Sequence, residues 1–146
     1  MDYAGAEVAT KLADVRATLA LNGAYGLAVT SLDEICYVYN IRGCDVPCNP
    51  VTISYALITA DKAYLFVDDD KVDDAVRTHL KDSGVEVLPY DAAIGTIGGA
   101  CESGKIWLDS KTANYKLFSS VQGADRVTKD SPLVLMKARK NAAELK

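Results

Sequence analysis

Histidine is almost absent from this chain, which has a single one, His79, among 146 residues. A metal-binding histidine needs partner ligands at suitable spacing. His79 has none nearby in the sequence, so we expect it on the flank of a helix. Cysteine is also scarce, with four residues at positions 36, 44, 48 and 101. Cys44 and Cys48 lack the second ligand pair of a zinc site, so we expect reduced thiols and no metal site.

Long apolar runs and an excess of positive charge are missing as well. No stretch approaches the roughly 20 apolar residues of a membrane-spanning helix. Residues 1–4 lack the basic start of a secretory signal. The net charge of −4 and the pI near 4.9 argue against nucleic acid as a partner, because phosphate binding needs a basic surface. We therefore expect a cytoplasmic protein that binds neither membranes nor nucleic acids.

The chain does have the composition of an ordinary globular domain, with 49% hydrophobic and 25% charged residues. Its length fits one domain. Apolar residues at helical spacing alternate along the chain with short β-rich runs. The expected helices cover residues 6–21, 114–121 and 132–146, with two more that follow Ser31 and Asp70, and the expected strands cover residues 25–30, 51–58, 63–67, 85–88, 105–108 and 126–128.

The order of these segments predicts the fold class. Residues 59–62 join two strands and predict a hairpin, so the sheet has an antiparallel pair. Strands and helices otherwise alternate, which predicts a layered α/β domain. We therefore expect an α/β fold in which a mixed β-sheet of about five or six strands is flanked by helices in a single domain. The Gly-rich residues 95–100 lack the spacing of a phosphate loop, and we expect a flexible turn there.

The most specific pattern lies between residues 31 and 50. Ser31 and Glu34 have the spacing of a capping box at the start of a helix. Arg42 and Gly43 are expected to end this helix, and prolines at positions 47 and 50 predict a turn-rich exit towards the next strand. A short capped helix followed by an Arg-Gly-x-Asp-Val-Pro-x-Asn-Pro loop is far more specific than any single dipeptide.

This helix and loop resemble part of the creatinase-type N-terminal domain of aminopeptidase P (Xaa-Pro aminopeptidase), in particular the second domain of the three-domain form. Residues 11–30, 64–69, 84–90 and 131–144 are also similar to that family. The resemblance implies a creatinase N-terminal-like domain over residues 1–130. It also implies that residues 131–146 begin the connecting helix towards a catalytic domain that this chain lacks.

The resemblance further implies a non-catalytic domain of a metal-dependent Xaa-Pro aminopeptidase, which releases the N-terminal residue before proline. The domain would shape the substrate cleft and the packing of domains and subunits. The parent would be a hydrolase whose separate catalytic domain holds two Mn²⁺ or similar divalent ions, whereas this chain alone would be inactive and hold no cofactor. The implied partners are the first and catalytic domains of the same parent, its proline-containing peptide substrate, and a second copy where the parent is a homodimer.

Three polar residues of the 40–50 loop are the candidates for the substrate cleft, namely Arg42, Asp45 and Asn49. The planar guanidinium of Arg42 suits a carboxylate, and the prolines hold Asp45 and Asn49 on a rigid path. These residues would orient the substrate rather than break its bond. The other interpretation is internal, with Arg42 paired to Asp45 or Asp33 and Asn49 closing an Asx turn.

Two other functions remain open. One is a stand-alone module that binds a peptide or a carboxylate. The other is a haloacid-dehalogenase-like phosphatase that uses Asp68 as nucleophile and Asp70 for the leaving-group proton, with magnesium offsetting the charge. That motif should open its fold, yet two expected strands precede it here. Asp69 or Asp70 can instead cap the following helix.

Overall fold

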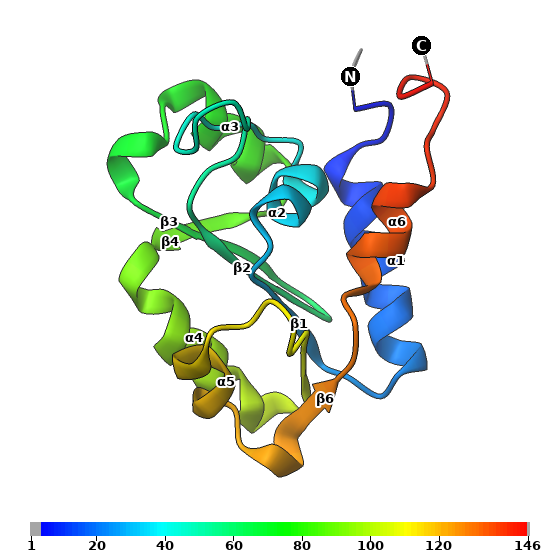
Figure 1. Cartoon of the computed structure of the whole chain (residues 1–146), viewed down its shortest axis with the longest axis vertical. Helices are drawn as coiled ribbons and strands as arrows, with labels where there is room; N and C mark the ends of the chain where they lie inside the picture. Colours follow the sequence, from blue (N-terminus) through cyan, green and yellow to red (C-terminus); the bar gives the residue numbers. More distant parts are fainter. Residues whose placement is uncertain (1–3, 146) are drawn as a thin grey trace.

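Short apolar runs build a sheet at the centre of the molecule. The structure, a computed structural model, describes residues 4–145. Within this part of the chain, six strands form one sheet in the order β4-β3-β2-β1-β5-β6 (Figure 1). The strands are β1 (Gly26–Val29), β2 (Tyr55–Thr59), β3 (Ala63–Val67), β4 (Glu86–Pro89), β5 (Ile106–Leu108) and β6 (Arg126–Thr128).

Helices cover both faces of this sheet (Figure 1). The α-helices are α1 (Val8–Leu21), α2 (Leu32–Tyr39), α3 (Asp74–Asp82), α4 (Ala93–Gly99), α5 (Tyr115–Ser120) and α6 (Pro132–Ala138). Short 3-10 turns lie at η1 (Asp69–Lys71), η2 (Tyr90–Ala92), η3 (Ala100–Ser103) and η4 (Gly123–Asp125). No helix within residues 4–145 has the length and apolar character that crossing a membrane requires.

The strand directions place one set of strand ends at a common edge. β2 pairs antiparallel with β1 and β3, whereas the pairs β3–β4, β1–β5 and β5–β6 are parallel. The β2–β3 connection is the expected hairpin, in which the backbone N–H of Thr59 donates to the carbonyl of Lys62 at 2.8 Å. The C-terminal ends of all strands except β2 therefore share an edge with the start of β2. In open α/β sheets this is the edge where loops form ligand sites.

Each strand divides its side chains between two apolar layers, because successive strand residues point to opposite faces. In β1, Leu27 and Val29 pack in the layer that contains α1, α2, α3 and α6, whereas Ala28 packs with α4 and α5. Leu65 and Phe66 of β3 separate in the same way. The expected mixed sheet flanked by helices in a single domain is confirmed.

Helix α2 begins where expected, but its ends are held differently. Ser31 occupies the N-cap position, yet its side chain makes no capping hydrogen bond, so the expected capping box is wrong. Glu34 is buried and accepts a hydrogen bond from Ser131 Oγ at 2.6 Å instead. The helix ends before the Arg-Gly pair because Asn40 adopts a left-handed conformation with φ of 53°, which asparagine tolerates at a helix C-terminus.

The glycine-rich segment contains a helix, α4, and not the expected flexible turn. Ala93 and Ile97 lie one turn apart and are both fully buried in the layer shared with α5. This packing offsets the poor helix propensity of glycine. Gly98 allows the two helices to approach closely, because a Cβ at this position would lie 3.2 Å from the carbonyl oxygen of Ser120.

Helix α3 also has a different cap from the expected one. Asp73 is its N-cap residue, and its carboxylate accepts a hydrogen bond from the backbone N–H of Val76 at 2.8 Å. Asp69 and Asp70 lie earlier, in the exposed turn η1. The expected cap at Asp69 or Asp70 is therefore wrong, and the acidic cap of α3 is Asp73.

Helix α6 starts as expected and ends early. Ser131 is its N-cap and accepts a hydrogen bond from the N–H of Leu133 at 3.3 Å, and Pro132 is its first residue. The helix ends at Ala138, so the expected helix to residue 146, which itself lies outside the described residues, is too long. Arg139 leaves the helix with extended ψ of 94°.

Candidate functional site

The candidate loop, residues 40–50, leaves α2 at a firmly held position. The ammonium group of Lys11 on α1 donates to the Asn40 side-chain oxygen at 2.6 Å and to the carbonyl of Tyr37 at 2.8 Å. The Asn40 amide in turn donates to the carbonyl of Ala6 at 2.8 Å. Burial lowers the pKa of Lys11. These contacts fix the point from which the loop starts.

The two arms of the candidate loop are joined by backbone hydrogen bonds. The N–H of Gly43 donates to the carbonyl of Pro50, and the N–H of Asp45 donates to that of Val51, each at 3.3 Å. A Cβ at Gly43 would lie 2.7 Å from the carbonyl oxygen of Val51. The close approach of the arms therefore requires glycine at this position.

Asp45 holds the base of the loop. Its carboxylate accepts hydrogen bonds from the N–H of Ile53 at 2.6 Å, from Thr52 Oγ1 at 3.1 Å and from Lys71 Nζ at 3.0 Å. Lys71 also lies 3.5 Å from Asp68. The backbone hydrogen bond from Ile53, followed by that from Lys71, lowers the pKa of Asp45, and the hydrogen bond to Asp45 raises the pKa of Lys71. Asp45 thus links the candidate loop to η1, the turn that follows β3.

Arg42 and Asn49 are exposed on the same loop. Among residues 4–145, Asp45 pairs with Lys71 and Asp33 with Lys137, and Arg42 forms no ion pair. The expected pairing of Arg42 with Asp45 or Asp33 is therefore wrong. The turn at Asn49 is closed by its backbone N–H, which donates to the carbonyl of Val46 at 3.1 Å, rather than by its side chain. Arg42 is therefore exposed on the same loop as the anchored Asp45.

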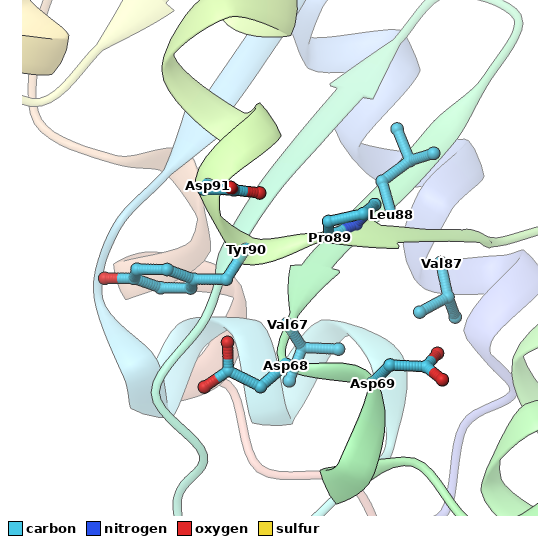
Figure 2. A pocket seen from close by; sticks show the side chains of 8 residues that line it. All are labelled: Val67, Asp68, Asp69, Val87, Leu88, Pro89, Tyr90 and Asp91. Carbon is cyan, nitrogen blue, oxygen red and sulfur yellow. The ribbon is translucent and has the colours of Figure 1, made fainter.

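A pocket of about 370 Å³ adjoins this cluster at the C-terminal ends of β3 and β4 (Figure 2). Asp68 belongs both to the pocket lining and to the Lys71–Asp45 cluster. In Figure 2 its carboxylate lies on the side of Tyr90, whereas the carboxylate of Asp69 points away from that ring. The residues lining the pocket are Val67, Asp68, Asp69, Val87, Leu88, Pro89, Tyr90 and Asp91.

Tyr90 and Lys71 were not predicted from the sequence. The ring of Tyr90 lies 5.2 Å from that of Tyr55, centroid to centroid. The Tyr55 hydroxyl accepts a hydrogen bond from the side-chain amide of Asn114 at 2.6 Å. Burial raises the pKa of Tyr90. Tyr90 directly follows β4, and Lys71 lies in η1, four residues after the end of β3. Their positions after the C-terminal ends of two strands are the only signal that could have marked them.

We searched the described residues, 4–145, for the side chains of a metal centre. Within residues 4–145 there is no group of three or more His, Cys, Asp or Glu side chains that could together hold a metal ion. His79 lies on α3, where Nε2 is 2.9 Å from the carbonyl oxygen of Tyr39. This contact ties α3 to the end of α2, as expected for a helix-flank histidine.

Asp68 and Asp70, the two residues of the phosphatase alternative, lack the surroundings of a magnesium-dependent phosphatase site. Asp68 is 3.5 Å from Lys71 Nζ, and Asp70 is exposed in η1. A magnesium-dependent phosphatase needs further carboxylates around the metal, and the described residues bring none to this pair. The geometry thus gives the phosphatase interpretation no support.

Comparison of sequences identifies the family. The sequence profile of the Creatinase/Prolidase N-terminal domain matches residues 1–144. An aminopeptidase P of Arabidopsis thaliana is 32% identical over 99% of this chain and 26% of its own length. A probable Xaa-Pro aminopeptidase P of Metarhizium acridum is 46% identical over 62% of this chain and 15% of its own length. The chain thus spans about a quarter or less of these relatives.

Comparison of structures agrees. The X-prolyl aminopeptidase of Caenorhabditis elegans, a cytosolic enzyme with a di-nuclear active site, superposes with a TM-score of 0.93 and 27% identity over 99% of this chain and 24% of that chain. The N-terminal domain of a cytoplasmic peptidase of Mycobacterium tuberculosis has the same fold, with a TM-score of 0.64 and 18% identity over 87% of this chain and 97% of that one. The resemblance expected from residues 31–50 is confirmed, and the chain belongs to the creatinase/prolidase N-terminal domain family.

Proposed function

We propose that this chain is a non-catalytic domain, corresponding to the second of three, of an Xaa-Pro aminopeptidase that releases the N-terminal residue before proline. Its curated relatives are aminopeptidases P, and it spans about a quarter of the first of them. Its described residues offer no metal donor set. The domain therefore contributes shape and packing, while hydrolysis belongs to a separate catalytic domain.

In this proposal the candidate loop lines one wall of the substrate cleft. The observation that carries it is the contrast between the anchored Asp45 and the exposed Arg42, which forms no ion pair within residues 4–145. Asp45 holds the loop, and Arg42 and Asn49 face outward to orient a peptide. The planar guanidinium matches the carboxylate of a short substrate.

The parent enzyme would use two divalent metal ions, with Mn²⁺ as the proposed metal, to activate water for attack on the peptide bond. The di-nuclear site of the Caenorhabditis elegans enzyme supports a pair of metals. Residues 1–130 would form the domain body, and residues 131–146 would lead to the catalytic domain. The first and catalytic domains of the same parent are the proposed partners, in a cytoplasmic enzyme that can form a homodimer.

The test is the substitution Arg42→Ala in the intact aminopeptidase that contains this domain. For a short Xaa-Pro peptide with a free C-terminal carboxylate, we expect kcat/KM to fall by about 10-fold, mainly through KM, because a charge-assisted hydrogen bond is lost. For the same peptide with a C-terminal amide, the variant should match the unmodified enzyme. Arg139→Ala, at another exposed arginine, is the control. Equal effects on both peptides, or none, would contradict the role of Arg42.

A second measurement separates this function from a stand-alone binding module. The 146-residue chain is titrated with MnCl₂ by calorimetry, assayed against Xaa-Pro peptides, and heated with proline-containing dipeptides. We expect no stoichiometric metal binding, no hydrolysis and an unchanged Tm. A dipeptide-dependent rise in Tm would favour the binding module. Hydrolysis by the chain alone would refute the proposal that the catalytic site lies in a separate domain.

A further inference from the structure

The pocket at the C-terminal ends of β3 and β4 has a mixed lining. Four apolar residues of these two strands form its walls, and Tyr90 lies beside three aspartates, Asp68, Asp69 and Asp91. Its volume of about 370 Å³ is large enough for a ligand group. A cavity with apolar walls and a few polar groups is the usual form of a ligand site, and in open α/β sheets such sites lie at this edge.

Tyr90 gives the pocket an aromatic side chain that its neighbours hold in place. Its ring lies 5.2 Å from the ring of Tyr55, centroid to centroid, and Tyr55 accepts a hydrogen bond from the amide of Asn114 at 2.6 Å. The face of an aromatic ring attracts cations, and arginine most often of all. Cations stack on three other rings within residues 4–145, those of Tyr37, Trp107 and Phe118, and none of these contacts involves Tyr90.

The cations beside the pocket are fewer than the carboxylates. Asp69 accepts a hydrogen bond from Arg77 Nη2 at 2.8 Å. Lys71 Nζ lies 3.5 Å from Asp68 but closer, at 3.0 Å, to Asp45 of the candidate loop. Asp68 therefore shares its only cation with another carboxylate.

Asp91 is the carboxylate of the pocket that is left without a cation. It is exposed and forms no ion pair within the described residues 4–145. In the view of Figure 2, Asp91 and Asp68 lie on opposite sides of Tyr90. The pocket thus combines apolar walls, an aromatic ring and negative charge that the chain itself does not neutralise.

We propose that this pocket binds the side chain of an arginine in a peptide. The aliphatic part of that side chain packs against the apolar walls, and the planar guanidinium stacks on Tyr90 and donates hydrogen bonds to Asp91 and Asp68. A lysine ammonium has no planar face and is more strongly hydrated, so it binds less well. That the arginine belongs to the parent's substrate rests on the proposed function, whereas binding by this chain does not.

The experiment titrates the 146-residue chain with acetyl-Gly-Arg-Gly-amide, in which the guanidinium is the only charge, and follows backbone amide signals by NMR. We expect saturable shifts at residues 67–69 and 87–91, with a millimolar Kd that rises with salt. The same peptide with citrulline, the neutral isostere of arginine, should bind about tenfold more weakly, because it lacks the charge-assisted hydrogen bonds.

Matched variants assign the binding to the pocket. Asp91→Asn should weaken arginine binding about tenfold, whereas Glu102→Gln, at an exposed carboxylate of η3, should not change it. Tyr90→Leu should weaken binding about fivefold and Tyr90→Phe should preserve it, because stacking needs the ring and not the hydroxyl. Equal binding of the arginine and citrulline peptides, shifts scattered over the surface, no shift at tens of millimolar, or full binding by Asp91→Asn would each overturn the proposal.

A separate assay asks whether the parent uses the pocket. In the intact aminopeptidase that contains this domain, Asp91→Asn should raise KM about tenfold for an Xaa-Pro peptide with an arginine after the proline, and leave KM for the citrulline counterpart unchanged. Arginine binding by the chain together with an unchanged KM in the parent would uphold the pocket and refute only its use in hydrolysis.

Discussion

Glu34 is buried, with only 5% of its surface exposed, whereas glutamate side chains usually lie at the protein surface. It accepts a hydrogen bond from Ser131 Oγ at 2.6 Å. Asp33 and Asp109 are nearby carboxylates, and Lys137 is a nearby cation that pairs with Asp33. Burial is the largest influence and raises the pKa of Glu34 above its ordinary value of 4.5.

The raised pKa of Glu34 makes the stability of the fold depend on pH. The folded state holds the Glu34 proton more tightly than the unfolded state, so the stability contributed by this group is present below pH 4.5 and is lost as pH rises through the folded pKa. Between the unfolded and folded pKa values of Glu34, the unfolding free energy of the unsubstituted chain should fall by up to about 1.4 kcal/mol per pH unit because of this group. In Glu34→Gln we expect this fall to be absent.

Urea unfolding at a series of pH values measures this slope. Glu86→Gln, at an exposed position of the edge strand β4, is the charge-matched control. Identical slopes in Glu34→Gln and in the unsubstituted chain would show that Glu34 does not carry this linkage.

Serine precedes two helices of this fold, and the two serines differ in what they do. Ser31 stands before α2 without a side-chain cap. Ser131 stands before α6, where it is buried, caps the N–H of Leu133 and donates to Glu34. One side chain thus joins the start of α6 to the first turn of α2.

We expect Ser131→Ala to lower the free energy of unfolding by about 1–3 kcal/mol, because it removes a cap and leaves the buried Glu34 carboxyl without its donor. Ser31→Ala should change it by less than about 0.5 kcal/mol. Chemical denaturation at neutral pH compares the two variants directly. Similar losses in both variants would contradict the assignment of the cap.

At the scale of the whole molecule, α6 belongs to the body of the domain. Leu133 is fully buried in the same apolar layer as α1 and α2, whereas Leu135 on the same helix is 68% exposed. Helix α6 therefore packs with the elements that precede residue 130, and a different role for residues 131–146 in a parent protein stays a proposal.

Two leucine substitutions test this packing. Leu133→Ala should lower the unfolding free energy by about 2–5 kcal/mol, because it leaves a cavity in the core. Leu135→Ala should have an effect within about 0.5 kcal/mol. Thermal and urea unfolding measure both, and a single cooperative transition is expected for each variant. A small effect of Leu133→Ala would mean that α6 is only loosely attached.

The sequence by itself determined the local elements, because their signals are local. Short apolar and β-rich runs placed β1 and β3, the turn residues placed the β2–β3 hairpin, and the Ser-Pro pair at residues 131 and 132 placed the start of α6. The loop after α2 also identified the family. These features depend on residues within a few positions of one another, where steric and hydrogen-bonding preferences act directly.

Only the tertiary structure decided which polar groups meet. Glu34 is hydrogen-bonded to Ser131, 97 positions away, and Asp45 to Lys71, 26 positions away. These distant residues replace the local partners expected from the sequence, Ser31 for Glu34 and Arg42 for Asp45. For Glu34 burial drives this choice, because a carboxyl removed from water must bond to whatever donor the packed elements bring to it. The same packing turned the glycine-rich segment into α4 and left Arg42 exposed.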